Sequence, residues 1–141
     1  MLSNGDTVFL AGADKFLLTS DGNRQLCYFI PLQPDSPPEF IPLKIQDNKA
    51  CGPISYDPSE NRIYWVDAAR EIKRAFLNNG SSQVVIKSVF GVKSLEIDFV
   101  GRNLYLTDFR SIRVVSLDRS YHAVLVHDVS VRGIALDSSL G

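Results

Sequence analysis

The sequence is poor in the residues from which catalytic and metal sites are most often built. It has two cysteines and two histidines among 141 residues. No Cys-x-x-Cys, His-Glu-x-x-His, Gly-x-Ser-x-Gly or phosphate-binding glycine-rich motif occurs. His122 and His127 are separated by an odd number of positions, which on a strand of period two puts them on opposite faces. We therefore predict no catalytic residue, no metal site and no cofactor.

Charge of one sign and long apolar runs are also lacking. The 15 basic and 16 acidic residues give a net charge of −1, which disfavours nucleic acid or an anionic membrane surface as a partner. No apolar run is long enough to cross a membrane, and the segment from Met1 to Phe16 lacks a basic region followed by an apolar one. Neither a membrane span nor a signal peptide is visible, which on its own indicates the cytosol.

The two cysteines, Cys27 and Cys51, leave the compartment open. They fit one disulfide, two buried free thiols, or a bridge to a segment outside this chain. Their separation along the chain allows contact without requiring it.

The chain repeats itself with a period of about 40 residues, which is typical of propeller blades. Three pairs of landmarks share one spacing: Asp57 and Asp98, Tyr64 and Tyr105, Asp67 and Asp108. Ile72 and Ile112 are closer by a single position, so one residue is inserted or deleted in the turn after the second aspartate. Residues 132–137 open a further copy.

Each copy consists of short apolar or alternating runs between turn residues, without a stretch of helical period. The pattern predicts four strands per copy, at 54–56, 62–66, 72–77 and 83–86, and again at 95–98, 103–107, 112–117 and 123–126. A weaker first copy has strands at 15–20, 25–32 and 40–45 around a proline-rich loop, 34–38. The predicted fold is an all-β partial propeller with blades at 16–50, 52–90 and 92–130 and the start of another at 132–141. Residues 1–15 stay unplaced.

Two segments carry a family resemblance, Asn61-Arg-Ile-Tyr-Trp-Val-Asp67 and Arg102-Asn-Leu-Tyr-Leu-Thr-Asp108. They resemble the YWTD, or class B, repeats of the low-density lipoprotein receptor family, and the flanking residues look most like the Wnt co-receptor branch. The resemblance implies a six-bladed propeller, of which this chain is about half. It also implies an extracellular, non-catalytic receptor module whose partners are secreted proteins, such as a Wnt-type ligand or antagonist.

The family motif implies a structural role for Tyr64, Trp65 and Tyr105, and a link between blades through Asp67 and Asp108. Three positions depart from it: Val66 replaces threonine, Leu106 replaces tryptophan, and Ser20 stands where the first blade would carry aspartate. Independently of the family, Asp57, Asp98 and Asp137 end their strands, so we expect them to cap the following turns.

The turns after the second aspartates are the expected ligand rim, with Ala69, Arg70, Phe109 and Arg110 as its residues. The basic stretch of Arg110, Arg113 and Arg119 fits either a ligand face or a solvated edge. Asn79-Gly80-Ser81 is a glycosylation sequon in a predicted hairpin turn.

Two other functions remain open at this point. A calcium-dependent lactonase-like enzyme needs unlike polar residues at the axis, where the inner strands offer Ser55, Ser94 and Glu96, and calcium should then stabilise it. The second is a non-secreted structural half-propeller, which the absence of a visible signal peptide favours. Because half a ring exposes two apolar sheet faces, we expect either a fragment of a longer receptor or self-association through those faces.

Overall fold

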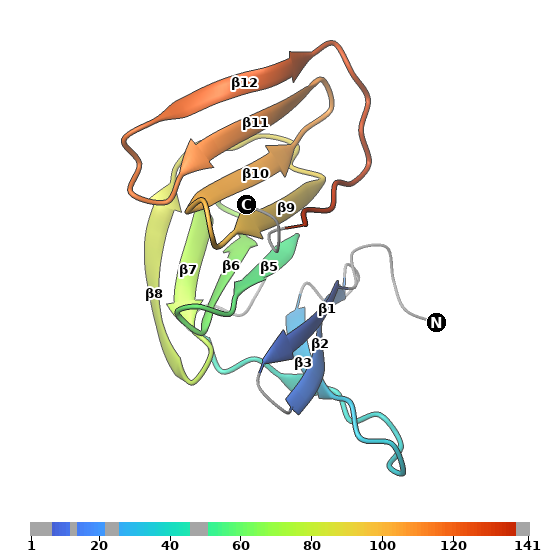
Figure 1. Cartoon of the computed structure of the whole chain (residues 1–141). Helices are drawn as coiled ribbons and strands as arrows, with labels where there is room; N and C mark the ends of the chain where they lie inside the picture. Colours follow the sequence, from blue (N-terminus) through green and yellow to red (C-terminus); the bar gives the residue numbers. More distant parts are fainter. Residues whose placement is uncertain (1–6, 12–13, 22–25, 46–50, 138–141) are drawn as a thin grey trace.

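The computed structural model describes residues 7–11, 14–21, 26–45 and 51–137, which form three antiparallel sheets of four strands each (Figure 1). The sheets follow one another along an arc. The first strands of the second and third sheets, β5 (Ile54–Asp57) and β9 (Ser94–Asp98), are in contact near its inner side. Over these described ranges no helix is long and apolar enough to cross a membrane. The predicted all-β partial propeller is confirmed.

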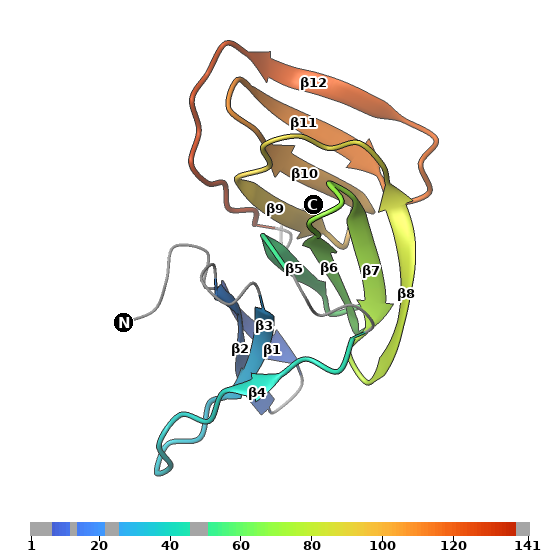
Figure 2. The same cartoon turned by 180° about the vertical axis from the view of Figure 1, so that it is seen from behind.

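The first sheet contains a strand in the segment that the sequence left unplaced. Its order is β1 (Thr7–Ala11), β2 (Asp14–Asp21), β3 (Leu26–Pro31) and β4 (Ile41–Pro42), with β4 at the outer edge (Figure 2). β1 pairs with β2 so that Val8 lies opposite Leu17 and Phe9 opposite Phe16. Part of the segment 1–15 therefore belongs to the first blade.

The second and third sheets follow the predicted strands closely. The second comprises β5, β6 (Arg62–Val66), β7 (Ile72–Phe76) and β8 (Asn79–Ile86). The third comprises β9, β10 (Asn103–Thr107), β11 (Ser111–Ser116) and β12 (His122–His127). Apart from the start of β8, every boundary in these two sheets lies within one residue of the prediction.

The start of β8 differs because the β7–β8 hairpin turn is shorter than expected. Asn79 is already paired with Phe76, which leaves Leu77 and Asn78 as the turn. Gly80 lies so close to the preceding blade that a Cβ there would overlap the Lys44 carbonyl oxygen. Glycine at position 80 is thus needed for close backbone packing. The hairpin turn predicted at the sequon was wrong, since Asn79 and Gly80 belong to the strand.

The sequence repeat is also a repeat of backbone geometry. Asn61 and Arg102 occupy equivalent positions of their two copies, and both are left-handed, with φ values of 53° and 58°. Each offers its carbonyl to an amide at the end of its own sheet, Asn61 to Leu77 and Arg102 to Leu117, at 2.9 Å in both cases. A left-handed conformation in a residue other than glycine costs about 1 kcal/mol. The surrounding hydrogen bonds and packing must therefore stabilise it in both copies.

The middle sheet is packed on both faces, and the alternation of Tyr64 and Trp65 along β6 explains how. Both side chains are fully buried but lie in different clusters. Trp65 joins the cluster with the first sheet, which includes Phe16, Leu18, Ile54, Tyr56 and Ile63. Tyr64 joins the cluster with the third sheet, which includes Ile72, Leu95, Ile97, Leu104 and Leu106. Each such side chain contributes about 1.5–3 kcal/mol on burial, so the two clusters hold the arc together.

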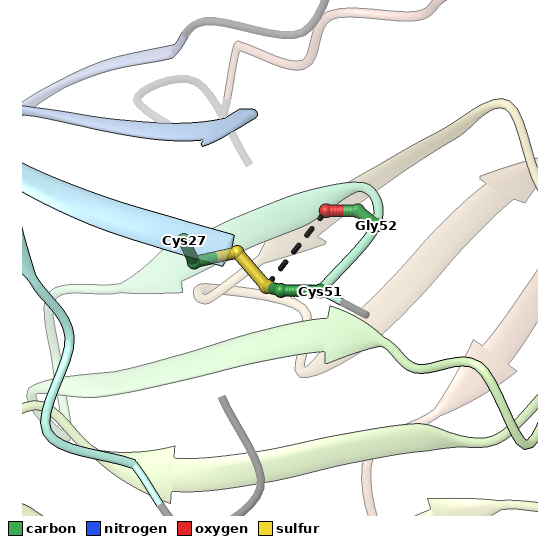
Figure 3. Close-up of a disulfide and its surroundings, with 3 residues drawn as sticks. All are labelled: Cys27, Cys51 and Gly52. Carbon is green, nitrogen blue, oxygen red and sulfur yellow. Dashed lines mark hydrogen bonds between the residues drawn. A yellow bond between two sulfur atoms is a disulfide. The ribbon is translucent and has the colours of Figure 1, made fainter. Parts of the chain in front are cut away.

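A disulfide joins the first sheet to the segment entering the second (Figure 3). Cys27 lies on β3 and Cys51 precedes β5, with Cα atoms 5.6 Å apart and both residues buried. The bond lies within the apolar cluster around Trp65, so it reinforces the contact between blades one and two.

We predict that reduction of this disulfide destabilises the chain by about 3 kcal/mol, since it releases a loop of 24 residues in the unfolded state. Urea unfolding followed by circular dichroism, with and without reductant, measures the difference. The paired variant Cys27→Ser with Cys51→Ser should show the lower stability and no response to reductant. An unchanged wild-type midpoint under reductant would contradict a structural role for the bond.

Candidate functional site

Asp67 and Asp108 each close the turn that follows their own strand. Asp67 accepts the amide of Glu71 at 3.0 Å and pairs with the Lys73 ammonium at 2.7 Å. Asp108 accepts the amides of Arg110 and Ser111, both at 2.8 Å. The two turns differ in length by one residue, which is the insertion expected from the sequence.

These contacts differ from the link between blades that the family motif implied. The Asp67 partners described above belong to the second blade, which carries Asp67 itself. The Asp108 partners, which also include the Ser111 hydroxyl and the Arg113 guanidinium, belong to the third blade, which carries Asp108. Burial raises the pKa of Asp108, but the amides, the Ser111 hydroxyl and the Arg113 guanidinium outweigh it and hold the pKa below its usual value. The carboxylate is thus ionised and engaged in its own turn.

Asp57 supplies a link between blades instead. Its Oδ1 accepts the Ser59 amide at 2.9 Å, as expected of a turn cap, while its Oδ2 pairs with Arg102 Nη1 of the third blade at 2.6 Å. The second terminal nitrogen of the Arg102 guanidinium, Nη2, contacts Glu60 at 2.9 Å. Because the Asp57 side chain is fully buried, Arg102 is its essential counter-charge.

Asp98 and Asp137 are the other two predicted turn caps. Asp98 accepts the amides of Val100 and Gly101 at 3.2 and 2.9 Å, so its carboxylate caps the β9–β10 turn. Asp137 lies at the end of the described ranges, and its predicted turn falls outside them.

We predict that Arg102→Met lowers the unfolding free energy by about 3 kcal/mol, because it leaves the buried Asp57 carboxylate without a counter-charge. Arg119→Met is the matched control, since Arg119 is exposed and has a similar φ of 65°. Chemical denaturation of both variants measures the effect. Equal losses would show that the pair between Asp57 and Arg102 is dispensable.

The predicted rim residues lie together at one end of the blades, here called the loop face. It is formed by the turns 67–71, 87–93 and 108–110, and Ala69, Arg70, Phe109 and Arg110 are all exposed on it. The β8–β9 connection is fixed to this end by a hydrogen bond from the Val89 amide to the Arg70 carbonyl at 2.8 Å. The opposite end, with turns 58–61, 77–78, 99–102 and 117–121, is called the hairpin end.

Sequence reasoning missed two residues of the loop face, Phe90 and Lys93. The Arg70 guanidinium lies 4.8 Å from the centre of the Phe90 ring, and the Lys93 ammonium 4.2 Å from that of Phe109. Both rings are well exposed, at 61% and 64%. The apolar pair Val89-Phe90 before Gly91 was the available signal: Val89 is buried in the cluster with the third sheet, and its neighbour Phe90 is left on the surface.

The remaining candidates do not form a site. Arg113 pairs with Asp108 at 3.1 Å, while Arg110 and Arg119 lie exposed at opposite ends of the blade, so the basic stretch is not one surface. His122 and His127 are exposed at the two ends of β12. In the described part of the chain, no three His, Cys, Asp or Glu residues gather as metal ligands would.

The polar residues of the inner strands are partly accounted for by structural bonds. The Ser55 hydroxyl accepts the Ile97 amide at 3.2 Å and so joins β5 to β9, while the hydroxyls of Ser94 and Thr107 lie 3.0 Å apart. Glu96 is different, because burial raises the pKa of its carboxyl to about 7. It lies on β9 opposite Tyr105, which is half-buried.

We predict that Glu96 makes stability fall as pH rises. A carboxyl whose folded pKa is raised binds more protons in the folded state, so ionisation destabilises the fold between about pH 4.5 and 7. Glu96→Gln should then be more stable than wild type above pH 7, by roughly 1 kcal/mol after allowance for solvent screening, and equal to it near pH 4. Denaturation midpoints across this range measure the difference; a constant difference would contradict titration of Glu96 as its cause.

Comparison with known sequences finds relatives for about half of the chain. Low-density lipoprotein receptor-related protein 5 from Homo sapiens is 34% identical over 71 residues, which are 48% of this chain and 4% of that protein. The Mus musculus protein of the same name gives the same identity and coverage. The chain therefore spans only a small part of these relatives. No family model matches it.

Comparison with solved structures covers nearly the whole chain. A chain in the crystal structure of a nidogen/laminin complex aligns with a TM-score of 0.74 and 20% identity, over 94% of this chain and 52% of that one. A gluconolactonase from Xanthomonas campestris aligns with a TM-score of 0.62 and 13% identity, over 94% and 50%. At such identities the likeness establishes the propeller fold alone, and this chain corresponds to about half of each.

Proposed function

Since the chain is part of a YWTD-type β-propeller of the kind found in low-density lipoprotein receptor-related proteins, we propose that it is a non-catalytic module that binds secreted proteins. The observation that carries the proposal is the loop face, where Phe90 and Phe109 expose their rings, each with a cation over it. Exposed aromatic residues and arginines are the residue types that dominate protein–protein binding energies.

The proposed partners are a Wnt-type ligand or a secreted antagonist, and the proposed location is the cell surface, within a longer receptor. The similarity to low-density lipoprotein receptor-related protein 5 supports this choice. The disulfide between Cys27 and Cys51 supports an oxidising compartment, because structural disulfides are rare in the cytosol.

The sequon at Asn79 fits the same proposal. Asn79 begins β8 next to the β7–β8 turn, at the hairpin end of the blade. The sequon is therefore at the opposite end of the blade from the turns of the loop face.

The proposal predicts that substitutions on the loop face weaken ligand binding and leave the fold intact. Immobilised wild-type chain is tested against Wnt-type ligands and secreted antagonists by biolayer interferometry. Phe109→Ser and Arg110→Gln should each weaken the binding found by about ten-fold or more. The cause is the loss of an exposed ring or cation at the contact.

Val100→Ser and Arg119→Gln are the matched controls, because both residues are exposed at the hairpin end. They should bind as wild type does. If the hairpin-end variants lose binding and the loop-face variants keep it, the ligand contacts the other end of the blades and the proposed rim is wrong.

A further inference from the structure

The loop face carries a local excess of positive charge although the whole chain has a net charge of −1. Asp67 and Asp108 are neutralised there by Lys73 and Arg113. The cations left over in the three turns are Arg70, Lys87, Lys93 and Arg110, with Glu71 and Asp128 as the neighbouring carboxylates. The field at this end of the arc therefore favours an acidic partner.

Two of these cations are held in place before any ligand binds. Arg70 lies over Phe90 and Lys93 over Phe109, which restricts both long side chains. The Arg70 backbone is also fixed, with a φ of 61° and its carbonyl bound by the Val89 amide. Less side-chain entropy is then lost when a carboxylate is bound.

A groove of about 520 Å³ runs along the same surface. Phe90, Gly91, Phe109 and Arg110 line it, as do the carboxylate residues Asp108 and Asp128, of which Asp108 is paired with Arg113. Gly91 has a φ of 62°, and a Cβ on it would come within 2.5 Å of the Phe109 ring. The ring lies directly against the glycine, so any side chain at position 91 would displace it.

We propose that an extended acidic segment of a partner protein binds here, with an apolar side chain in the groove against Phe90 and Phe109. Its carboxylates then meet Arg110, which lines the groove, and Arg70 and Lys93, which lie beside it over the two rings. This inference rests on the proposed protein-binding function and adds the chemistry of the ligand. Two exposed rings lining the groove favour a peptide over a sulfated polysaccharide, which would use the cations and leave the rings in water.

The probe is a fluorescein-labelled peptide of sequence Asp-Asp-Leu-Asp-Asp-Leu-Asp-Asp, titrated with the full chain and followed by fluorescence anisotropy. One control peptide has serine for leucine and another has lysine for aspartate. The acidic apolar peptide should bind about ten-fold more tightly than either control. Equal binding of the serine peptide, or complete competition by heparin at lower concentration than the unlabelled peptide, would mean a polyanion surface and overturn the inference.

Variants then locate the peptide on the surface. Arg110→Gln, Phe109→Ser and Gly91→Ala should each weaken the acidic apolar peptide by about five-fold or more, with Arg119→Gln and Val100→Ser unchanged. Gly91→Ala changes no charge, so its effect reports the position of the Phe109 ring. Circular dichroism verifies folding, and the peptide series on wild type tests the inference even if one variant fails to fold.

The two proposals fail in different ways. If no peptide binds but Phe109→Ser and Arg110→Gln still reduce binding of a secreted protein, the chemistry inferred for the ligand is wrong and the binding module stands. If neither peptide nor protein binding depends on these residues, both proposals are overturned.

Discussion

Burial of both faces of the middle sheet is the constraint on which the rest of the structure depends. A strand of period two sends Trp65 to one side and Tyr64 to the other, and both are fully buried only because a sheet lies on each side. A single blade has no means of covering both rings. The arc is therefore cooperative, since each contact between blades completes the core of two sheets at once.

Polar contacts between blades follow from this packing and do not cause it. Ser55 belongs to no recurring motif, yet its hydroxyl meets the Ile97 amide because the apolar faces have already brought β5 against β9. The pair of Asp57 and Arg102 is similar, since the carboxylate is buried by the approach of the third blade. Such a pair adds specificity of alignment, and its net contribution to stability is smaller than that of the apolar clusters.

The strands and the repeat were predictable from sequence because period two and a fixed spacing between landmarks can be read directly along the chain. β1 was not, since Thr7–Ala11 carries no landmark and is recognised only by its pairing with β2. The rim was predicted in part. Arg70 and Phe109 could be predicted because they follow the turn aspartates. Phe90 and Lys93 could not, because the path of the β8–β9 connection is what brings them against Arg70 and Phe109. The partners of Asp67 and Asp57 could not be predicted from the sequence, because a motif shows which residues recur and does not show which side chains they contact.

The repeat also separates two properties of the loop face. Arg70 and Arg110 occupy equivalent places in their blades. The Arg70 carbonyl accepts the Val89 amide and the Arg110 carbonyl accepts the Val129 amide, and each amide lies in the connection that follows the last strand of the same blade. The equivalent of Phe90 is then Ser130, so the rings do not recur with the blades. A cation that recurs in these two blades supports attraction along both, and rings that occur once fix the register of the bound segment. Charge then contributes mainly to the rate of encounter, while the choice among acidic partners depends on the groove that the third blade forms with the β8–β9 connection.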